Sequence, residues 1–334
     1  MLGNAHKNSR DEMMDCLKGV AIMFIVITHF KWSAEQRLVY CFPFWIDMAM
    51  PIFMLIAGYM GAMSFERRQI STLVEGYQFR GLTRRFMRFL MPFLLLVPCD
   101  VICGVANSSL SWKGAIFALI FGGQGPGSYF VPMILQFVLL FPLIFWVIKR
   151  QGLLGLSFLI AINVLYEIAC GGVDDLARVY RLILLRHLGV VSIGAYAFEV
   201  NLLQKPAMDV LVSFLLIAIG GVYIYAVNYG GYEPFVFTRW VNNSFPAALF
   251  TVGIVMFLRT VKPVKCLKWV GVMLGGITYE IFLVQKLFYA GSAAFVYAFP
   301  IPMFCKLLLC CATCVAGGRL FALIVCKVTA KLKI

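Results

Sequence analysis

The stretch MMDCLKGVAIMFIVITHF, residues 13–30, determines the class of this protein. It follows a polar segment, residues 1–12, and approaches the roughly 20 residues that an α-helix needs to cross the hydrocarbon core of a bilayer. The stretch is too long for the core of a signal peptide, and no small-residue cleavage site follows it. We therefore expect residues 13–30 to form the first of several membrane-spanning helices.

Apolar stretches of similar length continue along the rest of the chain, at 42–64, 84–106, 129–149, 152–169, 180–199, 208–228, 243–259, 271–290 and 303–328. A shorter run, 114–121, is too brief to span and predicts a re-entrant or interfacial piece. Hydrophobic residues make up 62% of the chain and charged residues only 13%, whereas about a quarter of a soluble domain is charged. These features predict an all-α, polytopic membrane protein with about ten transmembrane helices in a single domain, residues 1–334.

The lysines and arginines predict the orientation of these helices. With the N-terminus inside, the inner loops and helix ends hold 18 of them, whereas the outer side holds only five: Lys31, Arg37, Lys113, Arg178 and Arg239. Positively charged residues accumulate on the cytoplasmic side of membrane proteins. We therefore predict cytoplasmic termini and a multi-pass protein of the cell inner membrane. The same distribution accounts for the net charge of +14 without a nucleic-acid partner.

Ionisable residues inside the predicted spans form two layers, and such residues are functional candidates because burying them in lipid is unfavourable. The inner layer joins Lys18 to the arginines 84, 85 and 88, a donor-rich set that suits phosphate groups. The outer layer contains His29, Asp47, Glu167, Arg181, Gln285 and Lys286. Each residue also has an ordinary interpretation, since arginines at a helix start can contact lipid headgroups and buried charges can pair between helices. The joint pattern therefore carries more weight than any single residue.

The spacing within the first helix predicts a path between the two layers. Lys18 and His29 are eleven residues apart, which corresponds to about 16 Å and close to three helical turns. Both side chains therefore point to one face. Imidazole titrates near neutral pH and suits a general base. We predict that Asp47, at similar depth, lies within hydrogen-bond reach of His29, directly or through one water, and orients it.

Arginines 85 and 88 also share a helix face, because they are three residues apart. We predict that Lys18, Arg85 and Arg88 line the cytoplasmic mouth of a cavity and bind phosphates there. Arg84 points about 100° away on a helix with roughly 3.6 residues per turn, and we expect it to contact lipid headgroups instead.

Several segments resemble the acyltransferase family 3 membrane proteins. Their first helix carries a basic residue, ten intervening residues and a histidine, as Lys18 and His29 do here. Similar segments are IFMLIAGY at 52–59, RRFMRFLMP at 84–92, the stretch from Tyr129 through Gln136 to Pro142, and TYEIFLVQ at 278–285. These segments occur in the same order as in the family, and the expected number of about ten helices is also that of the family. The resemblance therefore spans nearly the whole chain.

Three positions depart from the pattern of the family. Lys18 stands where arginine is usual, which keeps the charge and loses the planar, forked guanidinium group. Ala57 stands where serine is common, and Gln285 where histidine is common. We therefore assign no chemical role to positions 57 and 285.

The resemblance implies transfer of an acyl group, usually acetyl from acetyl-CoA, to a hydroxyl of a sugar or another envelope molecule. The expected partners are acyl-CoA as cosubstrate, a cell-surface polysaccharide or its lipid-linked precursor, and membrane lipid; a homo-oligomer is compatible with the sequence. Transfer is either direct or passes through an acyl-histidine. No metal is expected: Cys311 and Cys314 form one C-x-x-C without the second pair of a zinc site.

Two other classes of function remain as alternatives. A secondary transporter or flippase would also carry charges near the midplane, but the sequence lacks a pair of broken helices in matching halves. A structural partner in an envelope assembly would leave the charges at both depths without a purpose. Hydrolysis of acetyl-CoA, or acyl transfer from it, by the purified protein separates the enzyme from both alternatives.

Overall fold

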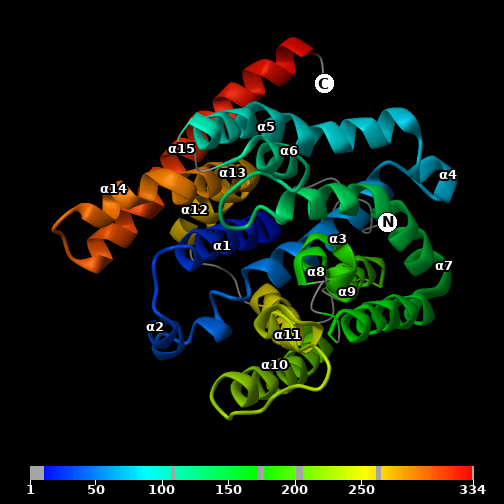
Figure 1. Cartoon of the computed structure of the whole chain (residues 1–334). Helices are drawn as coiled ribbons and strands as arrows, with labels where there is room; N and C mark the ends of the chain where they lie inside the picture. The colour runs from blue at the N-terminus through cyan, green and yellow to red at the C-terminus, as the bar shows by residue number, and fades with distance from the viewer. Residues whose placement is uncertain are drawn as a thin grey trace.

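The computed structural model describes residues 11–106, 110–171, 173, 177–200, 206–260 and 265–332, and this part of the chain is helical without a strand (Figure 1). The principal helices are α1 (Glu12–Thr28), α3 (Ala49–Arg67), α5 (Phe79–Ala106), α7 (Phe130–Gly171), α9 (Leu188–Glu199), α10 (Pro206–Asn228), α11 (Phe245–Thr260), α12 (Lys265–Gly275), α13 (Thr278–Leu287) and α15 (Met303–Leu332). Shorter elements are α2 (Ala34–Val39), η2 (Phe42–Phe44), α4 (Leu73–Gly76), α6 (Trp112–Ile120), α8 (Ala177–Leu182), η4 (Leu184–His187), η6 (Val241–Asn243), η7 (Phe288–Ser292) and α14 (Ala293–Ala298).

Six segments of the described chain are long and apolar enough to cross a membrane: Phe42–Arg67, Phe79–Ala106, Phe130–Gly171, Val210–Asn228, Thr278–Ala298 and Met303–Lys331. The chain is therefore an α-helical membrane protein, and both the number of about ten spans and the cytoplasmic termini stay predictions. Helix α1, with 17 residues, and α11, with 16, are shorter than these six. The apolar run at 180–199 is divided between α8, η4 and α9.

Helix α7 contains two of the expected spans, 129–149 and 152–169. The backbone leaves the helical conformation at Gly152, where φ is 53° and ψ is −123°, and the two limbs of α7 run in different directions (Figure 1). The two expected runs thus correspond to two helical limbs that meet at a bend at Gly152.

Ion pairs connect the segments that the charge distribution predicts on the inner side. Arg259, at the end of α11, contacts the carboxylate of Asp11 at 3.0 Å, and Lys268 in α12 pairs with Glu12. Lys149 in α7 contacts Glu66 at the end of α3 at 3.0 Å. Asp11 also caps α1, because its side chain accepts a hydrogen bond from the backbone N–H of Met14. The pairs of Asp11 and Glu12 thus hold the N-terminal end of α1 against α11 and α12.

Helices α3 and α9 pack at backbone contact through two glycines. A Cβ atom on Gly58 would lie 2.0 Å from the carbonyl oxygen of Val191, and one on Gly194 would lie 2.0 Å from the carbonyl oxygen of Leu55. Small residues permit such close approach between membrane helices, whose association depends on van der Waals packing. Peripheral α10 differs: only 17% of its apolar stretch is buried, as expected for a helix that faces lipid.

We predict that Gly58→Ala destabilises the protein, because the added methyl group overlaps the backbone of α9. Overpacking of this kind decreases the free energy of unfolding by about 1–3 kcal/mol, which thermal unfolding in detergent measures. Gly81→Ala is the matched control, since a Cβ atom at this position in α5 meets nothing within 4 Å. An equal melting temperature for both variants would contradict the close packing of α3 and α9.

Candidate functional site

Two cavities lie along one face of α1. The inner cavity has a volume of about 340 Å³ and is lined from this helix by Lys18, Ile22 and Ile25. The outer cavity, of about 1100 Å³, is lined by Ile25, Thr28 and His29. The residues at 18, 22, 25 and 29 follow the helical repeat, so the face shared by Lys18 and His29 is present as predicted. Ile25 and Met50 line both cavities, which therefore adjoin at these two side chains.

The inner cavity has a cationic lining. Its basic residues are Lys18, Arg68, Arg85 and Arg88, and its acidic residue is Glu280. The predicted residues Lys18, Arg85 and Arg88 thus line one cavity, and Arg84 is exposed and does not line it. Arg68, one of the 18 inner basic residues but not a predicted phosphate ligand, caps the end of α3 and joins this lining.

The side chains of this cationic set are held to different degrees. Arg85 donates to the backbone carbonyl of Gly76 at 2.7 Å, and its guanidinium carbon lies 4.6 Å from the ring centroid of Phe65. Lys18 forms an ion pair with Asp15, one turn earlier in α1, whereas Arg88 is exposed. The apolar lining, which includes Phe53, Phe130 and Phe282, continues from this cationic group toward the outer cavity.

The outer cavity combines polar groups with aromatic rings. His29 and Asp47 both line it, together with Arg37, Arg181, Asn243, Tyr129 and Trp240. Behind this wall the guanidinium of Arg186 lies 3.8 Å from the ring centroid of Trp240. Glu167, which we expected in the outer layer of polar residues, does not line this cavity. It is buried and accepts a hydrogen bond from the hydroxyl of Tyr180.

His29 is hydrogen-bonded through one ring nitrogen. It ends α1 as the C-cap residue, and its Nδ1 lies 2.9 Å from Oε1 of Gln285 in α13. An amide oxygen can only accept, so this arrangement puts the proton on Nδ1 and leaves the lone pair of Nε2 available. Gln285 is fully buried and contacts His29 directly, a contact that the sequence pattern did not predict.

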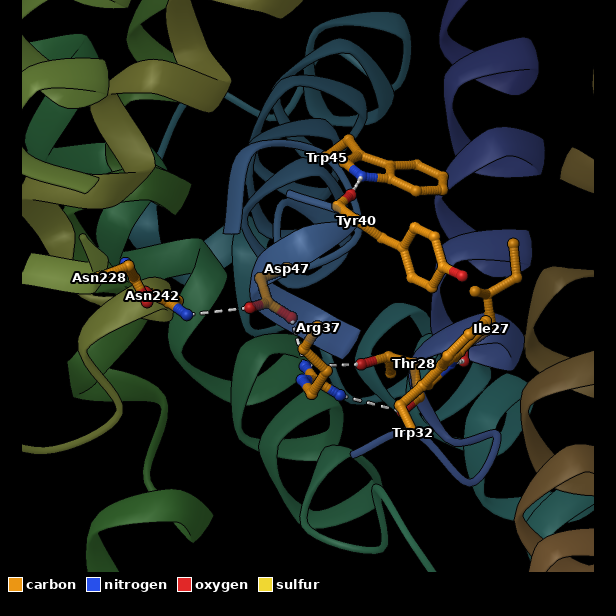
Figure 2. Close-up of polar contacts among 9 residues, drawn as sticks. All are labelled: Ile27, Thr28, Trp32, Arg37, Tyr40, Trp45, Asp47, Asn228 and Asn242. Carbon is orange, nitrogen blue, oxygen red and sulfur yellow. Dashed lines mark hydrogen bonds and ion pairs between the residues drawn. The ribbon is translucent and has the colours of Figure 1, made fainter. Parts of the chain in front are cut away.

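Asp47 makes no direct hydrogen bond to His29 in the described residues. The predicted alternative, a bridge through one water, stays a prediction. Among the described residues its carboxylate accepts from Arg37 at 2.8 Å and from the side-chain amide of Asn242 at 2.9 Å. Arg37 in turn donates to the hydroxyl and the backbone carbonyl of Thr28, the residue before His29. Figure 2 shows Arg37 between Asp47 and the end of α1. A guanidinium group with its several donors bridges both acceptors, so Asp47 reaches the end of α1 through Arg37.

The geometry brings a phosphate-compatible lining and a candidate base into adjoining cavities. A cationic group suits an anionic ligand, the apolar lining beyond it suits a slender uncharged chain, and His29 has an available Nε2. In the described residues no three His, Cys, Asp or Glu side chains are placed to hold a metal ion. The arrangement can therefore perform proton transfer by an imidazole next to a bound anionic ligand.

Comparison with known proteins agrees with this chemistry. The family described as "Acyltransferase domain", acyltransferase family 3, matches residues 11–322. No curated protein and no solved structure matches the chain. The family match includes both cavities and every helix from α1 to most of α15. The chain therefore belongs to the acyltransferase family 3, and it is a membrane acyltransferase.

Proposed function

We propose that this protein transfers an acetyl group from cytoplasmic acetyl-CoA to a sugar hydroxyl of a cell-surface polysaccharide or its lipid-linked precursor, in the cell inner membrane. One observation carries the proposal: the cavity lined by Lys18, Arg85 and Arg88 adjoins the cavity lined by His29 along a single face of α1. Family membership supports acyl transfer. The acetyl donor, the sugar acceptor and the type of membrane are our inference.

The proposed donor fits the inner cavity by its chemistry. Coenzyme A carries phosphates at one end and a thin pantetheine arm that ends in the thioester. Lys18, Arg68, Arg85 and Arg88 would bind the phosphates by charge-assisted hydrogen bonds, and the apolar lining would enclose the arm. The thioester would then lie near Ile25 and Met50, where the two cavities adjoin.

The acceptor would bind in the outer cavity, whose volume of about 1100 Å³ is large enough for a sugar unit. In the proposed step the sugar hydroxyl oxygen bonds to the thioester carbonyl carbon, and its proton passes to Nε2 of His29. The carbon–sulfur bond breaks as the ester forms, and the imidazolium returns the proton to the thiolate of coenzyme A. Gln285 holds the ring in the required tautomer by accepting from Nδ1.

The proposal is tested with purified protein in lipid nanodiscs, radiolabelled acetyl-CoA, and envelope glycan extracted from cells in which the gene has been deleted. We expect label to enter the glycan as a base-labile ester. Absence of both transfer and acetyl-CoA hydrolysis, from protein that is folded by thermal unfolding, would contradict the proposal.

Removing the base should abolish transfer. We expect His29→Ala to reduce the rate by about 10²–10⁴-fold, the contribution of a positioned general base. The Kd for coenzyme A, measured by calorimetry, should stay within about twofold, or roughly 0.4 kcal/mol, because His29 does not line the inner cavity. A variant with near-normal transfer would leave His29 as a structural residue at the end of α1.

Two arginines at the start of α5 form a matched pair for donor binding. Both Arg84 and Arg88 are exposed, but only Arg88 lines the inner cavity. We expect Arg88→Gln to raise the KM for acetyl-CoA about tenfold, the effect of one charge-assisted hydrogen bond in a partly solvated site. The KM for the glycan should not change, and Arg84→Gln should alter neither value. Equal small effects at both positions would indicate that the cluster only anchors the helix at the membrane surface.

Gln285 should affect the chemical step and not donor binding, because it touches His29 and lines neither cavity. We expect Gln285→Leu to lower kcat by at least about tenfold, since the ring loses the partner that fixes its tautomer. Gln285→His, the residue common in the family at this position, should restore part of the rate. Full activity of Gln285→Leu would exclude a positioning role.

A further inference from the structure

The segment Gly122-Gly123-Gln124-Gly125-Pro126-Gly127, here called the glycine loop, forms part of the wall of the outer cavity. It connects α6 to α7, and Gly125, Pro126 and Gly127 line the cavity. All four of its glycines have positive φ values, between 82° and 93°, a conformation that favours glycine. A Cβ atom on Gly127 would lie 3.5 Å from Cε1 of His29. The glycine loop thus forms the cavity wall beside the imidazole.

A buried ion pair holds the other side of the glycine loop. Lys286 in α13 is fully buried, and its Nζ donates to the carbonyl oxygen of Gly122 at 2.6 Å. The same ammonium group lies 3.6 Å from Oδ2 of Asp100 in α5, and this carboxylate accepts from the backbone N–H of Gln124 at 2.9 Å. Both members of the pair therefore bind the backbone of the loop.

The glycine loop packs directly against Lys286, with no room for a side chain between them. A Cβ atom on Gly123 would lie 2.1 Å from Nζ of Lys286, and one on Gly125 would lie 2.5 Å from the backbone oxygen of the same lysine. Only a residue without a side chain fits at these positions. The backbone conformation of the loop and the position of the ammonium group therefore depend on each other.

Stability alone does not account for this pair. Desolvation of two charges offsets most of their attraction, and well-packed apolar residues of similar volume are often as stabilising. Asp100 and Lys286 line neither cavity, so they do not contact a ligand there. What the pair adds is directional contacts to two backbone groups, the carbonyl of Gly122 and the N–H of Gln124, besides the contact between the two side chains.

We propose that Asp100 and Lys286 are positioning residues for the acceptor: they fix the glycine loop as the wall of the outer cavity beside His29, and so determine how the acceptor hydroxyl meets the imidazole. The inference rests on the proposed function for the identity of the acceptor. It predicts a selective effect, because the glycine loop lines the outer cavity and not the cationic inner cavity. Acceptor use depends on the pair, and donor binding does not.

The test compares Lys286→Met with Lys306→Met in the full-length protein in nanodiscs. Lys306 is a matched control, since it also donates to a backbone carbonyl, that of Tyr297 at 2.8 Å, from within an apolar helix and lines neither cavity. The measurements are hydrogen exchange of residues 118–130, calorimetric binding of coenzyme A, and the KM for glycan extracted from cells lacking the gene. Asp100→Asn and the double variant Asp100→Asn/Lys286→Met complete a cycle.

We expect Lys286→Met to increase exchange across the glycine loop and to raise the KM for the glycan at least about tenfold, equivalent to roughly 1.4 kcal/mol. The Kd for coenzyme A should stay within about twofold, or roughly 0.4 kcal/mol, and Lys306→Met should leave all three measurements unchanged. The double variant keeps the protein testable if the single one misfolds, because it leaves no unpaired buried charge.

Unchanged exchange in the glycine loop of a folded Lys286→Met or double variant overturns the proposal. A loop that exchanges faster while the KM for the glycan is unaltered also overturns it. If wild-type protein transfers no acetyl group at all, the proposed function fails, whereas the exchange data still decide whether the pair holds the loop.

Discussion

A charged side chain inside a membrane protein must be paired or must face a cavity, because lipid offers it no other partner. This constraint organises the described part of the chain. Asp47 pairs with Arg37, Lys286 with Asp100, and Asp15 with Lys18. Each pair joins separate elements or lies where a helix meets a cavity. The short helices α2 and α8 carry Arg37 and Arg181, which line the outer cavity together with Asp47.

The periodicity of α1 made one part of the site predictable. Residues on the same face of a single helix have fixed relative positions, so the spacing of Lys18 and His29 was sufficient to predict that both face the cavities along α1. The same holds for Arg85 and Arg88, which line the inner cavity while Arg84 does not. Positions within one helix follow from local geometry, and these residues needed no knowledge of neighbouring helices.

Contacts between helices were harder to predict. Asp47 and His29 lie at similar depth, but depth does not determine which donor reaches a carboxylate, and Arg37 with its several N–H groups occupies that position. Gln285 was assigned no role because histidine is common at this position in the family. An amide oxygen can nevertheless accept a hydrogen bond from imidazole, as the ring nitrogen of a histidine can. The two apolar runs on either side of Gln151 and Gly152, in contrast, correspond to the two limbs of α7, because the chain bends at Gly152.

The narrow junction at Ile25 and Met50 also bears on the electrical insulation of the membrane. A water-filled passage through both cavities would let protons and ions leak down their gradients, and a thin apolar section repels water columns. Ile25 is 5% exposed and Met50 is 4% exposed, and these two apolar side chains lie where the inner and outer cavities adjoin. Methionine is flexible enough to move aside for a slender chain. If the proposed donor binds, the two side chains that would admit its pantetheine arm would also have to keep the cavities apart, and so preserve the membrane potential, when the arm is absent.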